Sequence, residues 1–258
     1  METKHNDHIA LSKCNLLQFA NNGTIYYLDF NDMKIHKSYA KSYNTKKNYY
    51  SQERENYLHD FETEMGLVRS KLKRFHEEKT TFIFSSNLKD TLIKWIAIQS
   101  MRHPDFAKGI RNRSIADEIL YIPPDDNRYF SPLHLGQYYI DKVIAIYNRE
   151  LSKLKINIAI IDKNCILTWC LTPEHFVCYG KTFFFPLSPY EAIILTPEVQ
   201  DQTTEDTIVR GFIKFQTDEE IEPILQDYKK VTLEHTEKHL IGLKPCLEKM
   251  QRIYTNRG

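Results

Sequence analysis

A carboxylate and an imidazole stand side by side at Glu174 and His175, in a turn between short apolar runs of the chain. Such a pair can transfer protons as a general acid and base, and it can also bind a divalent metal ion. The turn begins at Thr172–Pro173 and is followed by the phrase FFFPLSP, whose prolines are typical of a fixed strand edge. These two residues are therefore the first candidate site, and the alternative is an ordinary polar turn without chemistry.

Further side chains suited to phosphate or proton chemistry are far apart in the sequence. They are His8, Glu62, Glu64 and Arg102. A guanidinium group can hold a phosphate through two parallel hydrogen bonds, and a glutamate can act as a base or bind a metal ion. Each of these residues taken alone is a surface residue by default, so a site exists only if the fold brings them together.

Residues 33–52 are the most concrete binding feature, because they carry lysines and tyrosines and no acidic residue. Lysine neutralises phosphates and tyrosine stacks on bases, which is what binding of single-stranded nucleic acid requires. The alternative is a solvated loop in a chain that is rich in both residue types. The candidate binding residues are Lys34, Lys37, Lys41, Lys46, Lys47, Tyr49 and Tyr50.

Composition excludes several function classes. The net charge of +1 gives no global field that would attract nucleic acid, so only a local patch could do so. The eight glycines form no Gly-rich phosphate-binding motif, and the five scattered cysteines include no CxxC pair, which favours reduced thiols. No apolar run suits a signal peptide or a membrane span. These features predict a soluble cytoplasmic protein without membrane contact.

The first half of the chain predicts a hairpin followed by helices. Residues 24–30 and 33–37, joined by a turn at Asn31–Asp32, have the strand-forming composition of a β-hairpin. From Ser51 onwards, apolar residues recur every three or four positions, which predicts an amphipathic helix. The apolar members of that helix are Leu58, Phe61, Met65, Val68, Leu72 and Phe75. Further helices are predicted at residues 88–102 with Asn87 as N-cap, at 106–120 and at 133–154.

The second half predicts a small sheet and then C-terminal helices. Ile156, Ile158 and Ile160 alternate as in a strand. The other predicted elements are a turn at 162–164, strands at 165–171, 183–185 and 192–195, a segment of either type at 208–215, a helix at 218–241 ended by Gly242 and Pro245, and a last helix reaching Tyr254. Strands grouped in blocks predict an α+β fold with an N-terminal hairpin, a helical middle, a small mostly antiparallel sheet and C-terminal helices. We expect one domain over residues 1–258, with a helical C-terminal extension at about 216–258.

His235 and His239 are four residues apart on the predicted helix, so both imidazoles would lie on one face, as helical metal pairs require. The order HExxH is absent, however, and the surrounding charges are typical of a solvated helix face. We therefore interpret both as surface histidines.

Several short motifs follow one another in a characteristic order. HIALSKCNLLQFA, beginning at His8, precedes a strand; KNYYS precedes a helix that carries Glu62; WIAIQSMRHP contains Gln99 and Arg102; and FFFPLSPYEAIIL ends the series. This order resembles the family called domain of unknown function 4238, which is found mostly in microbial genomes. The resemblance covers about residues 8–200. The family has no assigned activity, so the resemblance implies site residues and not a reaction.

Two departures from the family pattern bear on the site. Ser12 stands where the family usually has a proline, and Glu174 stands where its Thr-Ser-Asp-x-Pro turn has an aspartate. A catalytic carboxylate tolerates one extra methylene poorly because reactive geometry is tight. A structural carboxylate that caps a turn or pairs with Arg102 would tolerate it better.

The leading hypothesis is a cytoplasmic nucleic-acid-directed effector, nuclease-like and therefore a hydrolase, in a stress or phage-defence setting that the family resemblance implies. Glu62 and Glu174 would act as base or hold a divalent metal, His8 would transfer a proton with His175 nearby, and Arg102 would clamp a phosphate. The alternative is a non-catalytic module for a partner protein or polyanion. In that module Arg102 and Glu174 form a buried structural pair, and the Lys/Tyr segment holds the partner.

Overall fold

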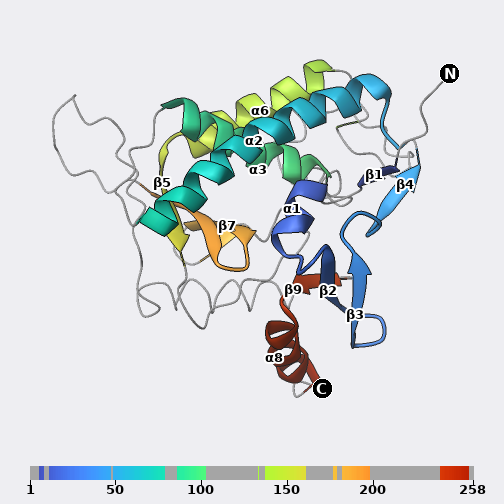
Figure 1. Cartoon of the computed structure of the whole chain (residues 1–258). Helices are drawn as coiled ribbons and strands as arrows, with labels where there is room; N and C mark the ends of the chain where they lie inside the picture. The colour runs from blue at the N-terminus through green and yellow to red at the C-terminus, as the bar shows by residue number, and fades with distance from the viewer. Residues whose placement is uncertain are drawn as a thin grey trace, which may run out of the picture.

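The computed structural model has an α+β fold, as the sequence predicts. It describes residues 6–8, 12–47, 49–78, 86–102, 133, 137–160, 177–178, 182–197 and 239–255. Long helices lie together on one side, and small antiparallel sheets lie beneath them (Figure 1). Among the described residues, none of the helices combines the length and the apolar character that a bilayer crossing requires.

The predicted hairpin is confirmed. Strand β2 (Thr24–Asp29) pairs with β3 (Lys34–Tyr39) in antiparallel register, and Met33 in the connecting turn has a φ of 54°. Strand β4 (Thr45–Lys47) follows and pairs with β1 (Asn6–His8). Four of the five candidate lysines therefore lie on strands, and Lys41 lies in the turn between β3 and β4.

The C-terminal part corrects the sequence prediction. His239–Gly242 form strand β9, which pairs with β2 and completes the sheet order β3-β2-β9, whereas a helix was expected through residue 241. These residues pair with the free edge of β2, because the hydrogen bonds and packing of a strand pair outweigh the local preference for a helix. His239 therefore lies on a strand, and its helical pairing with His235, which lies outside the described residues, is wrong. Pro245 stands in the first turn of helix α8 (Lys244–Thr255), where its missing N–H costs nothing.

The helical layer matches the predicted periodicity. Helix α2 (Gln52–Glu78) buries Leu58, Phe61, Met65 and Val68, and packs on α3 (Ser86–Arg102), which is buried along nearly its whole second half. Asn87 lies inside α3 and is not its N-cap. Helix α6 (Gln137–Leu151) covers α3 and ends three residues earlier than predicted, because Leu154 already belongs to the next strand.

The second sheet has the strand order β5-β8-β7-β6 and is antiparallel throughout. Its strands are β5 (Leu154–Ile160), β6 (Val177–Cys178), β7 (Thr182–Ser188) and β8 (Glu191–Pro197). Consecutive residues of β7 and β8 are buried, so both faces of these strands are covered. The predicted elements at 106–120, 162–164, 165–171 and 208–215 lie outside the described residues.

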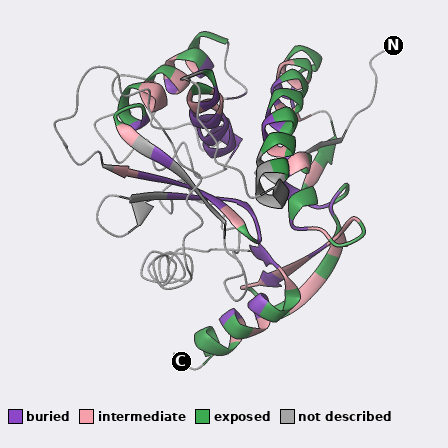
Figure 2. Cartoon of the chain, turned by 60° about the vertical axis from the view of Figure 1, so that its left-hand side comes forward, coloured by how far each residue is buried: buried purple, intermediate pink, exposed green. Residues whose placement is uncertain are grey.

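Two apolar cores hold these layers together. The larger core joins α1 (Lys13–Gln18), α2, α3 and α6 to the second sheet, and the smaller one lies under α8. Buried residues face inward while the outer faces of α2, α6 and α8 are exposed (Figure 2). The members of the smaller core are Leu28, Leu240, Cys246, Leu247 and Met250.

Two leucines test how far stability depends on the helical layer. Leu92 is fully buried on α3, and Leu67 on α2 is 64% exposed. Leu92→Ala leaves a cavity and should lower the free energy of unfolding by about 2–5 kcal/mol. Leu67→Ala should change it by less than about 0.5 kcal/mol. Urea unfolding monitored by circular dichroism measures both, and equal losses would contradict this packing.

Candidate functional site

Two residues that the sequence singled out meet in the structure. Glu62 of α2 and Arg102 of α3 form an ion pair, with 2.7 Å between the Glu62 Oε1 and Arg102 Nη2 atoms. The Arg102 side chain is 4% exposed and that of Glu62 is 22% exposed. Burial is the largest influence and acts to lower the pKa of Arg102, but Glu62, with smaller contributions from Tyr50, Cys14 and Glu55, outweighs burial and the pKa is raised. Arg102 therefore keeps its charge inside the helical layer.

One face of each helix contributes to this region. Trp95, Gln99 and Arg102 are spaced by four and three residues along α3, so they share a face, and all three are buried. Arg69 stands two turns beyond Glu62 on α2 and shares its face. The Arg69 guanidinium carbon lies 5.5 Å from the centroid of the Trp95 ring, a cation–π contact.

Helix α1 closes the region from the N-terminal side. Its N-cap Ser12 accepts a hydrogen bond from the Asn15 backbone N–H, and the Ser12 backbone N–H donates to Gln99 Oε1 at 3.4 Å. The Asn15 side-chain oxygen accepts a hydrogen bond from Arg69 Nη2. Cys14 Sγ lies 3.1 Å from the Ser12 hydroxyl. The short helix is thus attached to both α2 and α3 through polar side chains.

We call this group the arginine cluster. Its members are Ser12, Cys14, Asn15, Glu62, Arg69, Trp95, Gln99 and Arg102.

The charges of the cluster do not balance. Burial, with a smaller contribution from Glu62, raises the pKa of Cys14 to about 11, so its thiol is neutral near pH 7. Arg102 has Glu62 as its counter-ion, whereas the hydrogen-bond acceptor of Arg69 among the described residues is the neutral Asn15 amide. Burial lowers the pKa of Arg69, although the more distant carboxylates of Glu191 and Glu62 oppose this. Among the described residues, the Arg69 charge therefore has no adjacent anion.

The unsatisfied polar atoms of the cluster point to the same deficit. Among the shielded side-chain atoms without a hydrogen-bond partner in the described residues are N–H groups of four cluster members: Asn15 Nδ2, Arg69 Nε, Arg69 Nη1, Trp95 Nε1 and Gln99 Nε2. All are donors, and a buried donor without a hydrogen bond lowers the stability of the fold by about 1–3 kcal/mol. Water could accept these bonds, but it would leave the charge of Arg69 uncompensated. An oxyanion such as a phosphate or a carboxylate would supply both the acceptors and the charge.

A series of ring contacts connects the cluster to the lysine segment. The Arg102 guanidinium carbon lies 6.0 Å from the centroid of the buried Tyr50 ring, which meets Tyr49 edge-on at 4.9 Å. Lys46 Nζ lies 5.1 Å from the centroid of the Tyr49 ring. An exposed ammonium group and the buried guanidinium are therefore linked through two aromatic side chains.

The five candidate lysines, Lys34, Lys37, Lys41, Lys46 and Lys47, are all exposed. The tyrosines of this segment differ in how far their rings are exposed, and not all of them are accessible to a ligand. Tyr39 is 63% exposed and can offer its ring to a ligand, Tyr49 is half-buried, and Tyr43 and Tyr50 belong to the apolar core. We call the five lysines and Tyr39 the lysine face.

The structure gives less information about the remaining predicted site residues. His8 lies in β1 opposite Thr45, and its side chain is not described. Glu174 and His175 lie outside the described residues. Of the predicted constellation, the structure thus shows only the meeting of Glu62 with Arg102. Sequence reasoning missed Arg69 and Asn15 as site residues, although the spacing of Arg69 to Glu62 along α2 was a usable signal.

Comparison with protein-family models, curated proteins and solved structures found no match for this chain. The family resemblance drawn from the motifs therefore stays a prediction.

Removal of the Glu62 charge should expose the cost of burying Arg102. Glu62→Gln leaves a buried guanidinium without its carboxylate, which we expect to lower the free energy of unfolding by about 3–5 kcal/mol. Glu64→Gln is the matched control, because Glu64 is exposed on the same helix and accepts only a surface hydrogen bond from Thr91. Denaturant titration measures both variants. A loss no larger for Glu62→Gln than for Glu64→Gln would refute the buried pair.

The Cys14 thiol offers a chemical readout of the same region. A pKa of about 11, against an ordinary 9.0, reduces the thiolate fraction near pH 7 about a hundredfold. Cys14 should therefore react with iodoacetamide about a hundredfold more slowly than an unperturbed thiol, and its rate should rise until pH reaches about 11. Peptide mass spectrometry resolves Cys14 from the other cysteines. A rate that levels off near pH 9 would contradict its desolvation.

Proposed function

We propose that the protein is a nucleic-acid-directed effector, which binds a single strand on the lysine face and takes one phosphate into the arginine cluster. The observation that carries the proposal is Arg69, a guanidinium whose shielded Nε and Nη1 groups have neither a hydrogen-bond partner nor an adjacent anion in the part of the chain that the structure describes. A phosphodiester carries one negative charge and only acceptor oxygens, so it complements this deficit.

The lysine face supplies the sequence-independent part of binding. Its five exposed ammonium groups lie in a segment without acidic residues, and Tyr39 offers an exposed ring for stacking. Lys41 Nζ lies 6.0 Å from the centroid of that ring. The contacts from Lys46 through Tyr49 and Tyr50 to Arg102 connect this face with the cluster.

Hydrolysis of the bound phosphodiester is the catalytic form of the proposal. Glu62 is partly exposed beside Arg102, so it can take a proton from a water molecule whose oxygen bonds to phosphorus. Arg69 and Arg102 would stabilise the charge that develops on the phosphoryl oxygens while the ester P–O bond breaks. His8 would return a proton to the leaving oxygen, and Glu174 with His175 would hold a divalent metal ion, as the sequence suggests.

The non-catalytic alternative is favoured by one observation, the close and largely buried contact of Glu62 with Arg102. A carboxylate fully committed to a structural ion pair is a poor base. In this alternative the lysine face and Arg69 hold a polyanion without cleaving it. The cytoplasmic setting and a role in stress or phage defence belong to both forms as proposals, and they rest on composition and family resemblance.

Anisotropy of a labelled single-stranded oligonucleotide tests the binding. Changing all five lysines of the lysine face to Gln should reduce the slope of log affinity against log salt by about 3.5, because each phosphate contact contributes about 0.7. Arg69→Gln should weaken binding by at least about tenfold through loss of a charge-assisted contact. Lys153→Gln, an exposed lysine beyond α6, is the control and should change neither quantity.

Cleavage assays on the same oligonucleotide, with and without Mg²⁺ or Mn²⁺, separate the two forms. Cleavage that is lost in Glu62→Gln while binding persists supports the nuclease. Binding without cleavage by the wild type supports the polyanion-binding module. Absence of binding at low salt would refute the proposed function in both forms.

A further inference from the structure

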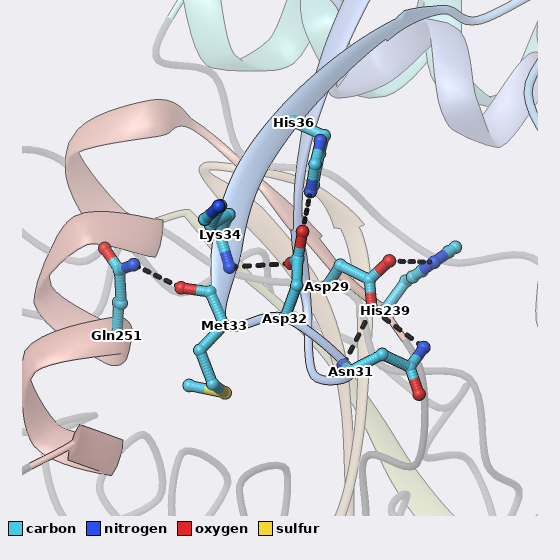
Figure 3. A network of polar contacts seen from close by, with 8 residues as sticks. All are labelled: Asp29, Asn31, Asp32, Met33, Lys34, His36, His239 and Gln251. Atoms are coloured by element: carbon cyan, nitrogen blue, oxygen red, sulfur yellow. Dashed lines mark hydrogen bonds and ion pairs between the residues drawn. The ribbon is translucent and has the colours of Figure 1, made fainter.

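A second group of polar side chains, none of them a member of the arginine cluster, lies at the turn of the β2–β3 hairpin (Figure 3). Asp29 ends β2, Asp32 stands in the turn, and His36 lies on β3. One oxygen of each carboxylate and a nitrogen of the imidazole lie within 4.8 Å of one another. Two carboxylates and an imidazole from three local positions form a ligand set for a divalent cation.

The turn fixes the orientation of both carboxylates. Asp29 Oδ1 accepts hydrogen bonds from the backbone N–H and the side-chain amide of Asn31, at 2.8 and 2.9 Å. Asp32 Oδ1 accepts one from the Lys34 backbone N–H at 2.9 Å. The second oxygen of each carboxylate therefore faces away from its own turn. For Asp32 that oxygen lies 2.9 Å from His36 Nε2.

His239 of β9 supports the group from the other side. Strand register places it opposite Asp29, and its Nε2 lies 3.4 Å from Asp29 Oδ2. Its Nδ1 lies 2.7 Å from the Tyr43 hydroxyl, and burial raises the pKa of that hydroxyl, so the hydroxyl keeps its proton and can donate it to a neutral imidazole. Nε2 then carries the ring proton and donates toward Asp29. A ligand carboxylate held in this way by an outer histidine is typical of metal sites.

The charge of the carboxylates and the packing of the imidazole rings favour the binding of a cation. The Asp29 carboxylate accepts hydrogen bonds from both the backbone and the side chain of Asn31, which favour its charged form. The Tyr27 ring lies between the two imidazoles, with centroids 5.5 Å from His36 and 4.6 Å from His239. The rings are thus restrained, and the negative charge of the carboxylates is not offset by a described ion pair with lysine or arginine.

We propose that Asp29, Asp32 and His36 bind a divalent transition-metal ion of the zinc type, with His239 as a positioning residue. The imidazole selects for such ions over Mg²⁺ and Ca²⁺, which prefer oxygen ligands. Ligand atoms bonded at about 2.0–2.2 Å to one ion lie closer together than 4.8 Å, so binding would draw the three side chains toward the ion. Three protein ligands leave a fourth position for water. The site stands independently of the proposed function.

The bound ion would stabilise the hairpin turn, which contacts the C-terminal elements β9 and α8. The Met33 carbonyl in the same turn accepts a hydrogen bond from Gln251 of α8, and β9 pairs with β2 directly behind the site. Metal binding should therefore raise the melting temperature of the full chain, since a ligand that binds only the folded state stabilises it.

The test is titration of the chelator-treated full-length protein with Co²⁺ and, in competition, with Zn²⁺. We expect one ion bound with absorption bands of oxygen and nitrogen ligation, and affinity reduced at least about a hundredfold in His36→Gln and Asp32→Asn. His239→Gln should reduce affinity about tenfold, as outer-shell changes do. His59→Gln and Asp60→Asn, exposed on α2, are the matched controls and should bind as the wild type does.

Thermal unfolding of the metal-free variants guards against misfolding, because each should melt within a few degrees of the wild type before metal is added. Three results would overturn the site: no binding below millimolar Co²⁺, equal affinity in wild type and both ligand variants, or thiolate charge-transfer bands that assign the ion to cysteines.

Discussion

Burial of the Arg102 guanidinium is the constraint on which the helical layer depends. A charge cannot remain in the interior without a partner, so α2 must present Glu62 to the end of α3. This orientation of α2 also places Arg69 over Trp95, and Arg69 in turn holds Asn15 of α1. Compensation of one buried charge thus contributes, together with the larger apolar core, to the way these three helices pack.

The same constraint leaves the guanidinium of Arg69 without an adjacent anion among the residues that the structure describes. Glu62 is committed to Arg102, Cys14 is a neutral thiol, and the amides of Asn15 and Gln99 turn unpartnered N–H groups into the cluster. Such a surplus of donors is costly for folding alone and useful for holding an oxyanion. A stabilising pair and a binding feature therefore lie next to each other, which explains why one set of residues suits both the catalytic and the non-catalytic proposals.

Local patterns predicted much of the fold. The three- and four-residue spacing from Leu58 to Val68 predicted α2, and the hairpin followed from β-prone residues around a turn. Strand β9 could not be predicted, because His239 pairs with Asp29 far away in the sequence. For the site, Glu62 and Arg102 were identified as candidates, but Arg69 was not, since its acceptor lies on α1. Tyr50 was predicted as a binding residue, and only tertiary packing shows that it belongs to the core.

The central claim is that the Arg69 charge lacks a counter-ion among the described residues and binds an oxyanion. Stabilisation by inorganic phosphate is its most direct test. Melting temperatures of wild type, Arg69→Gln and Lys153→Gln would be compared in phosphate and in chloride at equal ionic strength. The account predicts that phosphate raises the melting temperature of wild type and Lys153→Gln above the chloride value, and that Arg69→Gln shows no such difference. Equal responses of wild type and Arg69→Gln would contradict it.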